Sequence, residues 1–184
     1  MKKLVHLGLG FTQPKPKISL KFVADFSDTL ESLNLDGDYK DLLTIIPMLK
    51  KLKSFWLTST KLKGFDFLQG LPIETIGNYG GRVESFDFLP NIHSLKKIWI
   101  KTNSKIENID FIEELPNLED IELQYVAKVT RFPKCDHLKN LKRIFAFECN
   151  RLEDISEVRK LKISNIFISG NKLQGRHFKV EQKN

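Results

Sequence analysis

Apolar residues recur along this chain in a three-residue pattern that returns about every 22 positions. Each copy has an apolar residue, two variable positions, a second apolar residue, one variable position and a third apolar residue, as in Leu30, Leu33 and Leu35. Further copies begin at residues 52, 73, 95, 118, 141 and 163, and 20 of the 21 pattern positions are apolar. The end of each copy alternates between apolar and variable residues, which predicts a strand with one buried face.

A second apolar pair follows most of these predicted strands. The pairs are Leu62 with Phe65, Val83 with Phe86, Ile106 with Ile109, Val129 with Phe132, and Leu152 with Ile155. One repeat cannot bury both apolar sets alone, so the pattern favours stacked repeats that share one continuous core. The segments between strands, such as GFDFLQGLP at 64–72, contain Pro and short polar interruptions, which favour 3-10 turns over long helices.

The pattern resembles the leucine-rich-repeat family, whose signature is L-x-x-L-x-L-x-x-N/C-x-L within roughly 20 to 29 residues. A spacing of about 22 residues is similar to the short repeat class of bacterial internalins. The resemblance implies an α/β solenoid of about seven repeats. It also implies a parallel β-sheet on the concave face and 3-10 or irregular turns on the convex face.

The chain departs from the family signature at its Asn/Cys position. Only three of the seven residues there follow the family, so we expect an irregular internal side-chain ladder. The residues at this position are Asp38, Thr60, Gly81, Asn103, Val126, Cys149 and Asn171. Asn78 also replaces an apolar residue and lies beside Gly77, so we expect the third repeat to be distorted.

The pattern divides the chain into three parts. Residues 1–29 are expected to form an N-terminal β cap, because Leu4, Leu7 and Leu9 repeat the motif at an irregular distance from the next copy. Residues 30–173 are expected to form the solenoid. Residues 174–184 are short, polar and basic, and we expect a C-terminal closing strand or a tail there.

The composition is that of an ordinary globular domain. Of 184 residues, 41% are hydrophobic and 29% are charged, and no stretch has the pattern of a transmembrane helix or a signal peptide. We therefore expect a cytoplasmic protein without membrane association. Cys135 and Cys149 are expected to be reduced there, because two cysteines do not make a disulfide framework.

Catalytic and metal-binding motifs are absent from the sequence. The four histidines, at 6, 93, 137 and 177, form no pair with metal-ligand spacing, and the two cysteines lack C-x-x-C spacing. There is also no G-x-S-x-G elbow, P-loop or H-E-x-x-H motif. We therefore expect neither an enzyme nor a bound cofactor or metal.

Aromatic residues occupy strand positions that should point away from the core. If the leucine positions face inward, the residues between them face outward onto the concave side. This row contains both tryptophans of the chain, and such exposed aromatics are typical of interaction sites. We predict partner-binding residues in this row and the two columns beside it, namely Trp56, Tyr79, Lys97, Trp99, Lys101, Asp120, Glu122, Arg143, Phe145, Phe147 and Phe167. A shift of one residue in register would turn these aromatics into the core.

The charges in this face are mixed. Lys97 and Lys101 flank Trp99 and favour an acidic partner surface, whereas Asp120 and Glu122 one repeat later favour a basic one. A mixed pattern suits one specific protein better than a uniform polyanion.

The function that these features favour is non-catalytic protein binding, which the family resemblance also implies. The most concrete prediction is a bacterial immunity or inhibitor protein that neutralises a toxin, because the repeats carry no attached effector domain. We expect a monomer that forms a heterodimer with its partner. An intracellular scaffold or adaptor is the first alternative.

Nucleic-acid binding is the second alternative. It is suggested by the net charge of +7, the pI near 9.3 and aromatics that can stack on bases. However, 24 of the 30 basic residues are lysines, and arginine supplies most bidentate contacts to phosphates and bases. Lysines such as Lys50, Lys51 and Lys53 also lie in the segments between strands, as expected of a solvated surface. We therefore do not expect a nucleic-acid partner.

Overall fold

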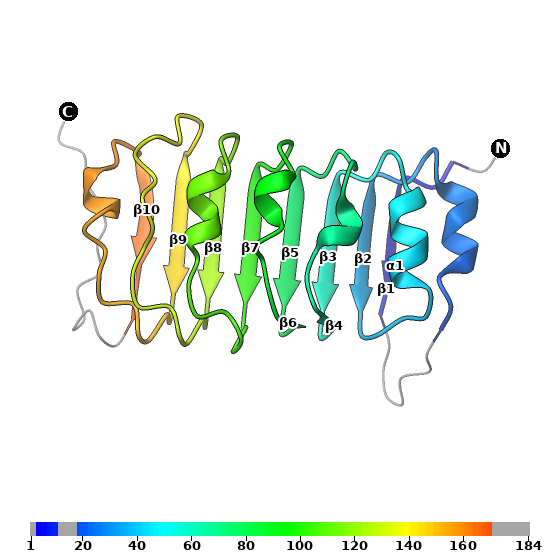
Figure 1. Ribbon diagram of the computed structural model, residues 1–184, viewed down its shortest axis with the longest axis horizontal. Helices are drawn as coiled ribbons and strands as arrows, with labels where there is room; N and C mark the ends of the chain where they lie inside the picture. The colour runs from blue at the N-terminus through cyan, green and yellow to red at the C-terminus, as the bar shows by residue number, and fades with distance from the viewer. Residues whose placement is uncertain (1–2, 11–17, 171–184) are drawn as a thin grey trace.

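The computed structural model describes residues 3–10 and 18–170, and their main element is a parallel sheet of eight strands. The strands lie side by side nearly in sequence order (Figure 1). They are β1 (His6–Leu9), β2 (Ser32–Asp36), β3 (Ser54–Thr58), β5 (Thr75–Tyr79), β7 (Lys97–Lys101), β8 (Asp120–Gln124), β9 (Arg143–Phe147) and β10 (Asn165–Ile168). Two short strands, β4 (Lys61–Leu62) and β6 (Arg82–Val83), form a separate parallel pair.

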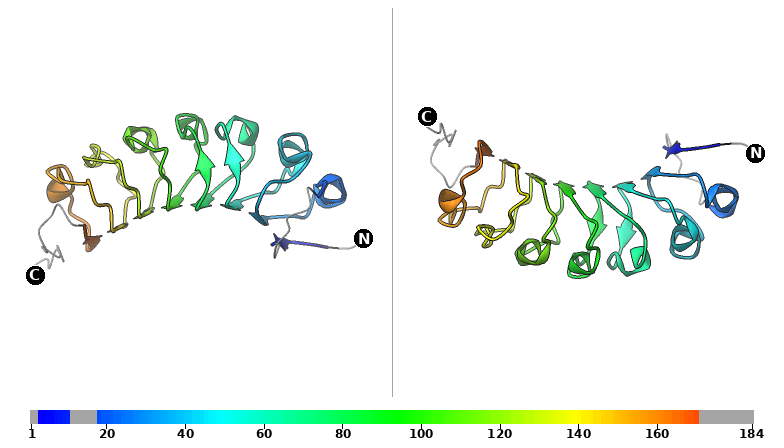
Figure 2. Two further views of the ribbon diagram at one scale, coloured as in Figure 1. Left: turned by 90° about the horizontal axis from the view of Figure 1, so that it is seen from below. Right: turned by 90° about the horizontal axis from the view of Figure 1, so that it is seen from above.

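Short helices connect the strands on the other side of the sheet. The single α-helix of the described residues, α1 (Leu42–Ile45), has four residues, and the remaining helices are 3-10 helices, as the Pro-containing segments predict. These are η1 (Lys21–Phe26), η2 (Ile46–Met48), η3 (Asp66–Leu68), η4 (Leu89–Asn91), η5 (Asp110–Glu114) and η6 (Val158–Lys160). Viewed along the strands, the elements form an arc with strands on its inner side and helices on its outer side (Figure 2). The predicted solenoid, with a parallel sheet on the concave face and 3-10 turns on the convex face, is therefore confirmed.

The strand register is the one that the apolar pattern predicts. Along the sheet Leu33 is paired with Phe55, which is paired with Ile76, and the same column continues through Ile98 and Ile121. All five of these side chains are fully buried. The core thus lies between the sheet and the convex helices, and the residues that alternate with these positions lie on the concave face.

The third repeat is not distorted in the sheet, contrary to the prediction from Asn78. Strand β5 pairs residue for residue with β3 and β7, and Asn78 is fully buried at its apolar position. Its Oδ1 accepts a hydrogen bond from Nδ2 of Asn103, at 3.3 Å. The polar partner from the next repeat satisfies the Asn78 oxygen, whereas its Nδ2 has no partner among the described residues, and the strand pairing is unbroken.

The ends of the chain are described only in part. Within residues 1–29, β1 pairs in parallel with β2 and continues the main sheet, and η1 lies between them in sequence. Residues 174–184, for which we predict a closing strand or a tail, lie outside the described residues.

Candidate functional site

The outward-facing strand residues form continuous rows across the concave face. The register pairs Trp56 with Gly77, Gly77 with Trp99, Trp99 with Glu122 and then Glu122 with Phe145. The structure therefore brings together all of the predicted partner-binding residues, on six strands from β3 to β10. The aromatic side chains among them are partly exposed, so they are available for contact with another molecule.

Three of these aromatics form one group on β3, β5 and β7, here called the tryptophan cluster. It consists of Trp56, Tyr79 and Trp99. The ring centroid of Trp56 lies 4.9 Å from that of Trp99 in an edge-to-face arrangement and 5.6 Å from that of Tyr79. Nε1 of Trp56 donates a hydrogen bond of 2.7 Å to the hydroxyl of Ser54, which fixes the indole orientation.

Gly77 makes the tryptophan cluster possible, a role that the sequence pattern did not reveal. It lies between Trp56 and Trp99 in the outward row, and a Cβ at this position would come within 1.9 Å of Cε3 of Trp56. Because Gly77 has no side chain, the Trp56 indole leans over β5 and reaches Trp99. The glycine at this position therefore determines how the cluster packs.

A Gly77→Ala substitution is expected to displace the Trp56 indole and lower the free energy of unfolding by about 1–3 kcal/mol through overpacking. Urea unfolding would measure the loss. Intrinsic fluorescence would report the displacement, because Trp56 and Trp99 are the two tryptophans of the chain.

Gly8→Ala is the matched control for this substitution. Gly8 is in the same outward row on β1, and its added Cβ would meet no atom within 4 Å. Its effect is expected to stay within about 0.5 kcal/mol. Equal effects of the two substitutions would contradict the role of Gly77.

A second aromatic group, here called the phenylalanine cluster, occupies the C-terminal end of the face. It consists of Phe145, Phe147, Phe167 and Tyr125. Phe145 and Phe167 stack with centroids 4.9 Å apart, and Tyr125 meets Phe147 edge-to-face at 5.6 Å. Tyr125 is 45% exposed and was not predicted as a site residue, because it follows β8 outside the alternating positions, with a positive φ of 53°.

A polar band on β8 and β9 separates the two clusters. The Arg143 guanidinium forms ion pairs of 2.8 Å with Asp120 and 2.7 Å with Glu122, and it lies 5.2 Å from the Phe145 ring centroid. Glu122 also accepts a hydrogen bond of 2.7 Å from the Gln124 amide. The carboxylates of Asp120 and Glu122, which favour a basic partner surface, are therefore both already paired with Arg143 within the chain.

The two lysines that flank Trp99, unlike Arg143, have no carboxylate partner in the described part of the chain. Lys97 and Lys101 are exposed, and neither forms an ion pair within residues 3–10 and 18–170. The two positive charges beside the tryptophan cluster are therefore not neutralised by an ion pair within these residues.

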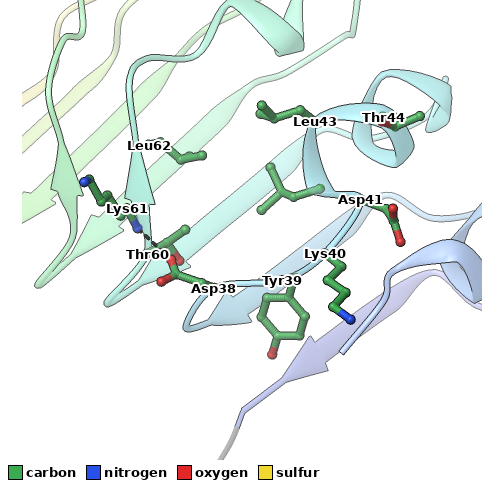
Figure 3. Close-up of a pocket in the computed structure, with 10 residues that line it drawn as sticks. Asp38, Tyr39, Lys40, Asp41, Leu43, Thr44, Thr60, Lys61 and Leu62 are labelled. Atoms are coloured by element: carbon green, nitrogen blue, oxygen red, sulfur yellow. Dashed lines mark hydrogen bonds between the residues drawn. The ribbon is translucent and has the colours of Figure 1, made fainter. Parts of the chain in front are cut away.

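A different surface hollow lies between the loops that follow β2 and β3 (Figure 3). It measures about 570 Å³ and is lined in part by Asp38, Tyr39, Asp41 and Lys61. Most of its polar groups already have local partners. Asp38 accepts a hydrogen bond from the Lys61 backbone N–H, the Tyr39 hydroxyl donates to the Leu9 carbonyl, and Asp41 accepts from the Ser19 hydroxyl. These bonds give the hollow a structural role in joining the first repeats.

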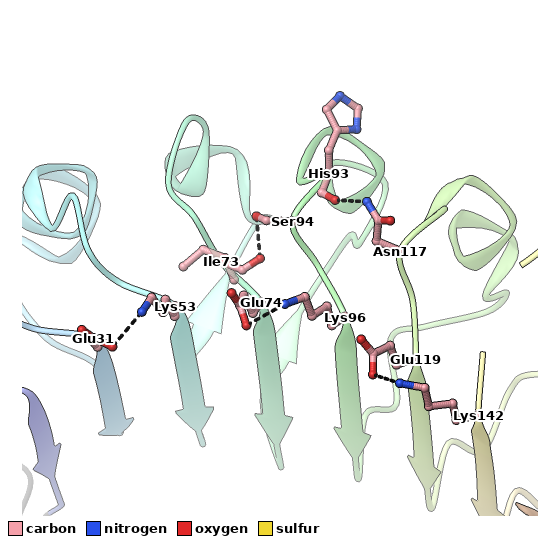
Figure 4. A network of polar contacts seen from close by, with 10 residues as sticks. All are labelled: Glu31, Lys53, Ile73, Glu74, His93, Ser94, Lys96, Asn117, Glu119 and Lys142. Carbon is pink, nitrogen blue, oxygen red and sulfur yellow. Dashed lines mark hydrogen bonds and ion pairs between the residues drawn. The ribbon is translucent and has the colours of Figure 1, made fainter. Parts of the chain in front are cut away.

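Ion pairs between neighbouring repeats lie along the end of the sheet at which the strands begin (Figure 4). Lys53 pairs with Glu31, Lys96 with Glu74 and Lys142 with Glu119, at 2.9, 3.1 and 2.7 Å. The lysine ammonium lowers the pKa of Glu31 and of Glu119 in the first and last pairs. These lysines therefore do not add to an uncompensated basic surface.

The described residues contain little that supports reaction chemistry. Cys135 and Cys149 are buried, and burial raises the pKa of their thiols to about 12 and about 11, which keeps them protonated and unreactive. Within the same residues, no group of three or more His, Cys, Asp or Glu side chains is arranged to hold a metal ion. A bilayer-crossing helix is also not found there, since the longest helix, η1, has six residues.

Comparisons with solved structures identify the fold. The chain is similar to an internalin from Listeria monocytogenes, with a TM-score of 0.61 and 17% identity over 83% of this chain and 45% of that one. A leucine-rich-repeat protein from Leptospira interrogans gives 0.63 and 21% identity over 84% and 41%. A plant peptide hormone receptor in complex with RGF2 gives 0.50 and 15% identity over 80% and 33%.

The chain spans less than half the length of each of these three structures. No protein-family model matches the chain, and no curated protein matches it. The structural likeness therefore shows the fold, a leucine-rich-repeat solenoid, and the predicted resemblance is confirmed at that level.

Proposed function

Because the chain folds as a leucine-rich-repeat solenoid, we propose that it is a non-catalytic module that binds a specific protein through its concave face. The observation that carries the proposal is the pair of partly exposed aromatic clusters on that face. The sheet and the core need no aromatics at these outward positions. Exposed aromatics and arginine dominate binding energetics in protein interfaces, so their concentration here supports binding.

The layout of the face also supports a specific protein partner. Two apolar clusters flank a band in which Arg143 is held by Asp120 and Glu122, so the face has an ordered apolar and polar pattern. A rigid parallel sheet presents these groups with little rearrangement, which reduces the entropic cost of association. The solved receptor complex among the similar structures is consistent with binding of another chain by this fold.

The more concrete form of the proposal is a bacterial immunity or inhibitor protein. In this role the concave face would cover a toxin domain in the cytoplasm, and the monomeric solenoid would form a heterodimer with the toxin. An intracellular scaffold or adaptor would use the same face, and it would bind a partner whose activity is not blocked.

Nucleic-acid binding is supported less well by the charges. Several lysines are paired with glutamates at the end of the sheet where the strands begin, and Arg143 is paired on the concave face. These pairs lower the positive charge that is available to phosphates. Binding to nucleic acid would fall steeply as salt rises, whereas binding of one protein through aromatic clusters would fall much less.

Affinity capture from the native host at moderate salt tests the proposed function. The wild-type protein is expected to retain one stoichiometric protein, and Trp99→Ala and Phe145→Ala are each expected to weaken that complex by about 2 kcal/mol. Titration calorimetry with the captured protein would measure the change. If the captured protein is a toxin, assay of its activity with and without this chain would test the inhibitor role.

The matched control for these variants is Lys134→Ala, which changes an exposed residue outside the sheet. It is expected to leave the affinity unchanged. Equal capture by the wild type and by the Trp99→Ala/Phe145→Ala double variant would contradict concave-face binding.

A further inference from the structure

A second hollow opens beside the tryptophan cluster, where β3, β5, β7 and β8 end. It measures about 410 Å³, and it is lined by Thr58, Ser59, Tyr79, Lys101, Thr102 and Gln124 together with the Gly80 backbone. Tyr79 is common to the hollow and to the cluster, since its ring centroid lies 5.6 Å from that of Trp56. A molecule that packs on the tryptophans would therefore be within reach of the hollow.

The lining of this hollow is rich in hydrogen-bond donors without partners. Within the described part of the chain, the hydroxyls of Thr58, Ser59, Tyr79 and Thr102 and the Lys101 ammonium form no hydrogen bond or ion pair. The backbone carbonyls at the same strand ends are already used. Those of Tyr79, Lys101 and Gln124 accept hydrogen bonds from the N–H groups of Ser59, Gly80 and Thr102.

The one charge among the residues that line the hollow is positive. No aspartate or glutamate lines it, and Lys101 is its one charged side chain. The nearest carboxylate on the adjacent strand, Glu122, is held by Arg143 and by the Gln124 amide at 2.7 Å each. Lys101 therefore has no acidic partner within the described residues.

The Tyr79 phenol remains a donor at neutral pH. Burial raises the pKa of this phenol, and the neighbouring Glu122 carboxylate raises it further. The hydroxyl thus keeps its proton and can donate a hydrogen bond to an oxygen placed between it and Lys101.

We propose that this hollow binds a carboxylate side chain of the partner, from a segment whose adjacent apolar side chain packs on the tryptophan cluster. The inference rests on the proposed protein-binding function and names the chemistry that one part of the face recognises. A carboxylate supplies several acceptor sites and a negative charge, which match the free hydroxyls and the Lys101 ammonium. An aspartate or glutamate beside an aromatic or large aliphatic residue fits both surfaces at once.

A display selection with random short peptides against the wild-type protein tests this inference. Enriched peptides are expected to carry Asp or Glu next to an aromatic or large aliphatic residue. A synthetic peptide of the enriched sequence is expected to change the intrinsic fluorescence, since both tryptophans lie in the adjacent cluster. Its Glu→Gln form is expected to bind about tenfold more weakly, because a charge-assisted hydrogen bond is lost.

Variants of two exposed lysines provide a matched comparison. Lys101→Gln is expected to weaken the acidic peptide about tenfold, whereas Lys134→Gln, with the same charge change outside the sheet and the hollow, is expected to have less than about a threefold effect. With the Gln-containing peptide, Lys101→Gln is expected to have little effect.

Enrichment of no peptide, or of peptides without acidic residues, would overturn the inference, as would equal effects of the two lysine variants. Loss of peptide binding in Trp99→Ala but not in Lys101→Gln would reject the carboxylate site and leave concave-face binding in place. Equal binding of the peptides by wild type and by Trp99→Ala would count against the proposed function as well.

Discussion

Replacement of Ile121 by alanine is expected to lower the free energy of unfolding by about 2–5 kcal/mol. Ile121 is fully buried in β8, and its neighbours along the inward row are Ile98 and Ile144, which are also fully buried. The substitution removes apolar surface from the core and leaves a cavity that the repeats on both sides cannot fill, because both present rigid strand residues. Urea unfolding followed by circular dichroism would measure the loss.

Trp99→Ala, in the outward row, is the matched comparison for Ile121→Ala in the inward row. Trp99 is on the adjacent strand, but it belongs to the outward row and is partly exposed, so its loss leaves no enclosed cavity. We expect it to destabilise the protein less than Ile121→Ala while weakening partner binding. A larger loss of stability for Trp99→Ala than for Ile121→Ala would mean that the strand register is shifted by one residue.

Replacement of Asn103 by alanine is expected to cost about 2–4 kcal/mol, because two backbone donors lose their acceptor in the interior. Oδ1 of the fully buried Asn103 accepts hydrogen bonds from the N–H groups of Lys105 and Ile106, at 2.8 and 3.2 Å. Its Nδ2 donates to Oδ1 of Asn78, at 3.3 Å. Thus the substitution also removes the donor that bonds to Oδ1 of the buried Asn78. The urea midpoint would measure the effect.

Asn108→Ala is the matched control, since Asn108 makes the same kind of bond on the surface. Its Oδ1 accepts from the Asp110 N–H at 3.2 Å, and water can replace it there. The expected cost is less than about 1 kcal/mol. If the two asparagines proved equally costly to remove, burial would not explain the importance of Asn103.

The residues at the Asn/Cys position of the repeat show that the signature does not predict the hydrogen bonds inside the solenoid. Thr60 and Asn103 are buried and hydrogen-bonded, the former to the Gly37 carbonyl at 2.9 Å, and Cys149 is a buried thiol. Val126 is fully buried and apolar, whereas Asp38 is exposed and caps the Lys61 N–H. The residue at this position therefore differs in burial and hydrogen bonding among these five repeats, which a shared signature does not predict.

The predicted partner-binding residues show the same limit of sequence-based prediction on the concave surface. Their common face followed from strand alternation, because a period of two sends alternate side chains to opposite sides of a sheet. The contacts among these side chains could not be predicted from strand alternation. The pairing of Arg143 with Asp120 and Glu122 depends on how a long side chain bends across β8, and alternation says nothing about that.

The repeat, the strands, the inward row and the outward row could all be predicted from the amino-acid sequence, because they depend on the local alternation of apolar and variable residues. The contacts among the outward residues could not, because they form between different repeats. Trp56 and Trp99 are 43 residues apart and touch because Gly77 leaves space between them. The donor-lined hollow at Lys101 likewise draws on four strands. Such contacts join side chains one or two repeats apart, so their geometry is determined by packing across the sheet and not by the order of neighbouring residues.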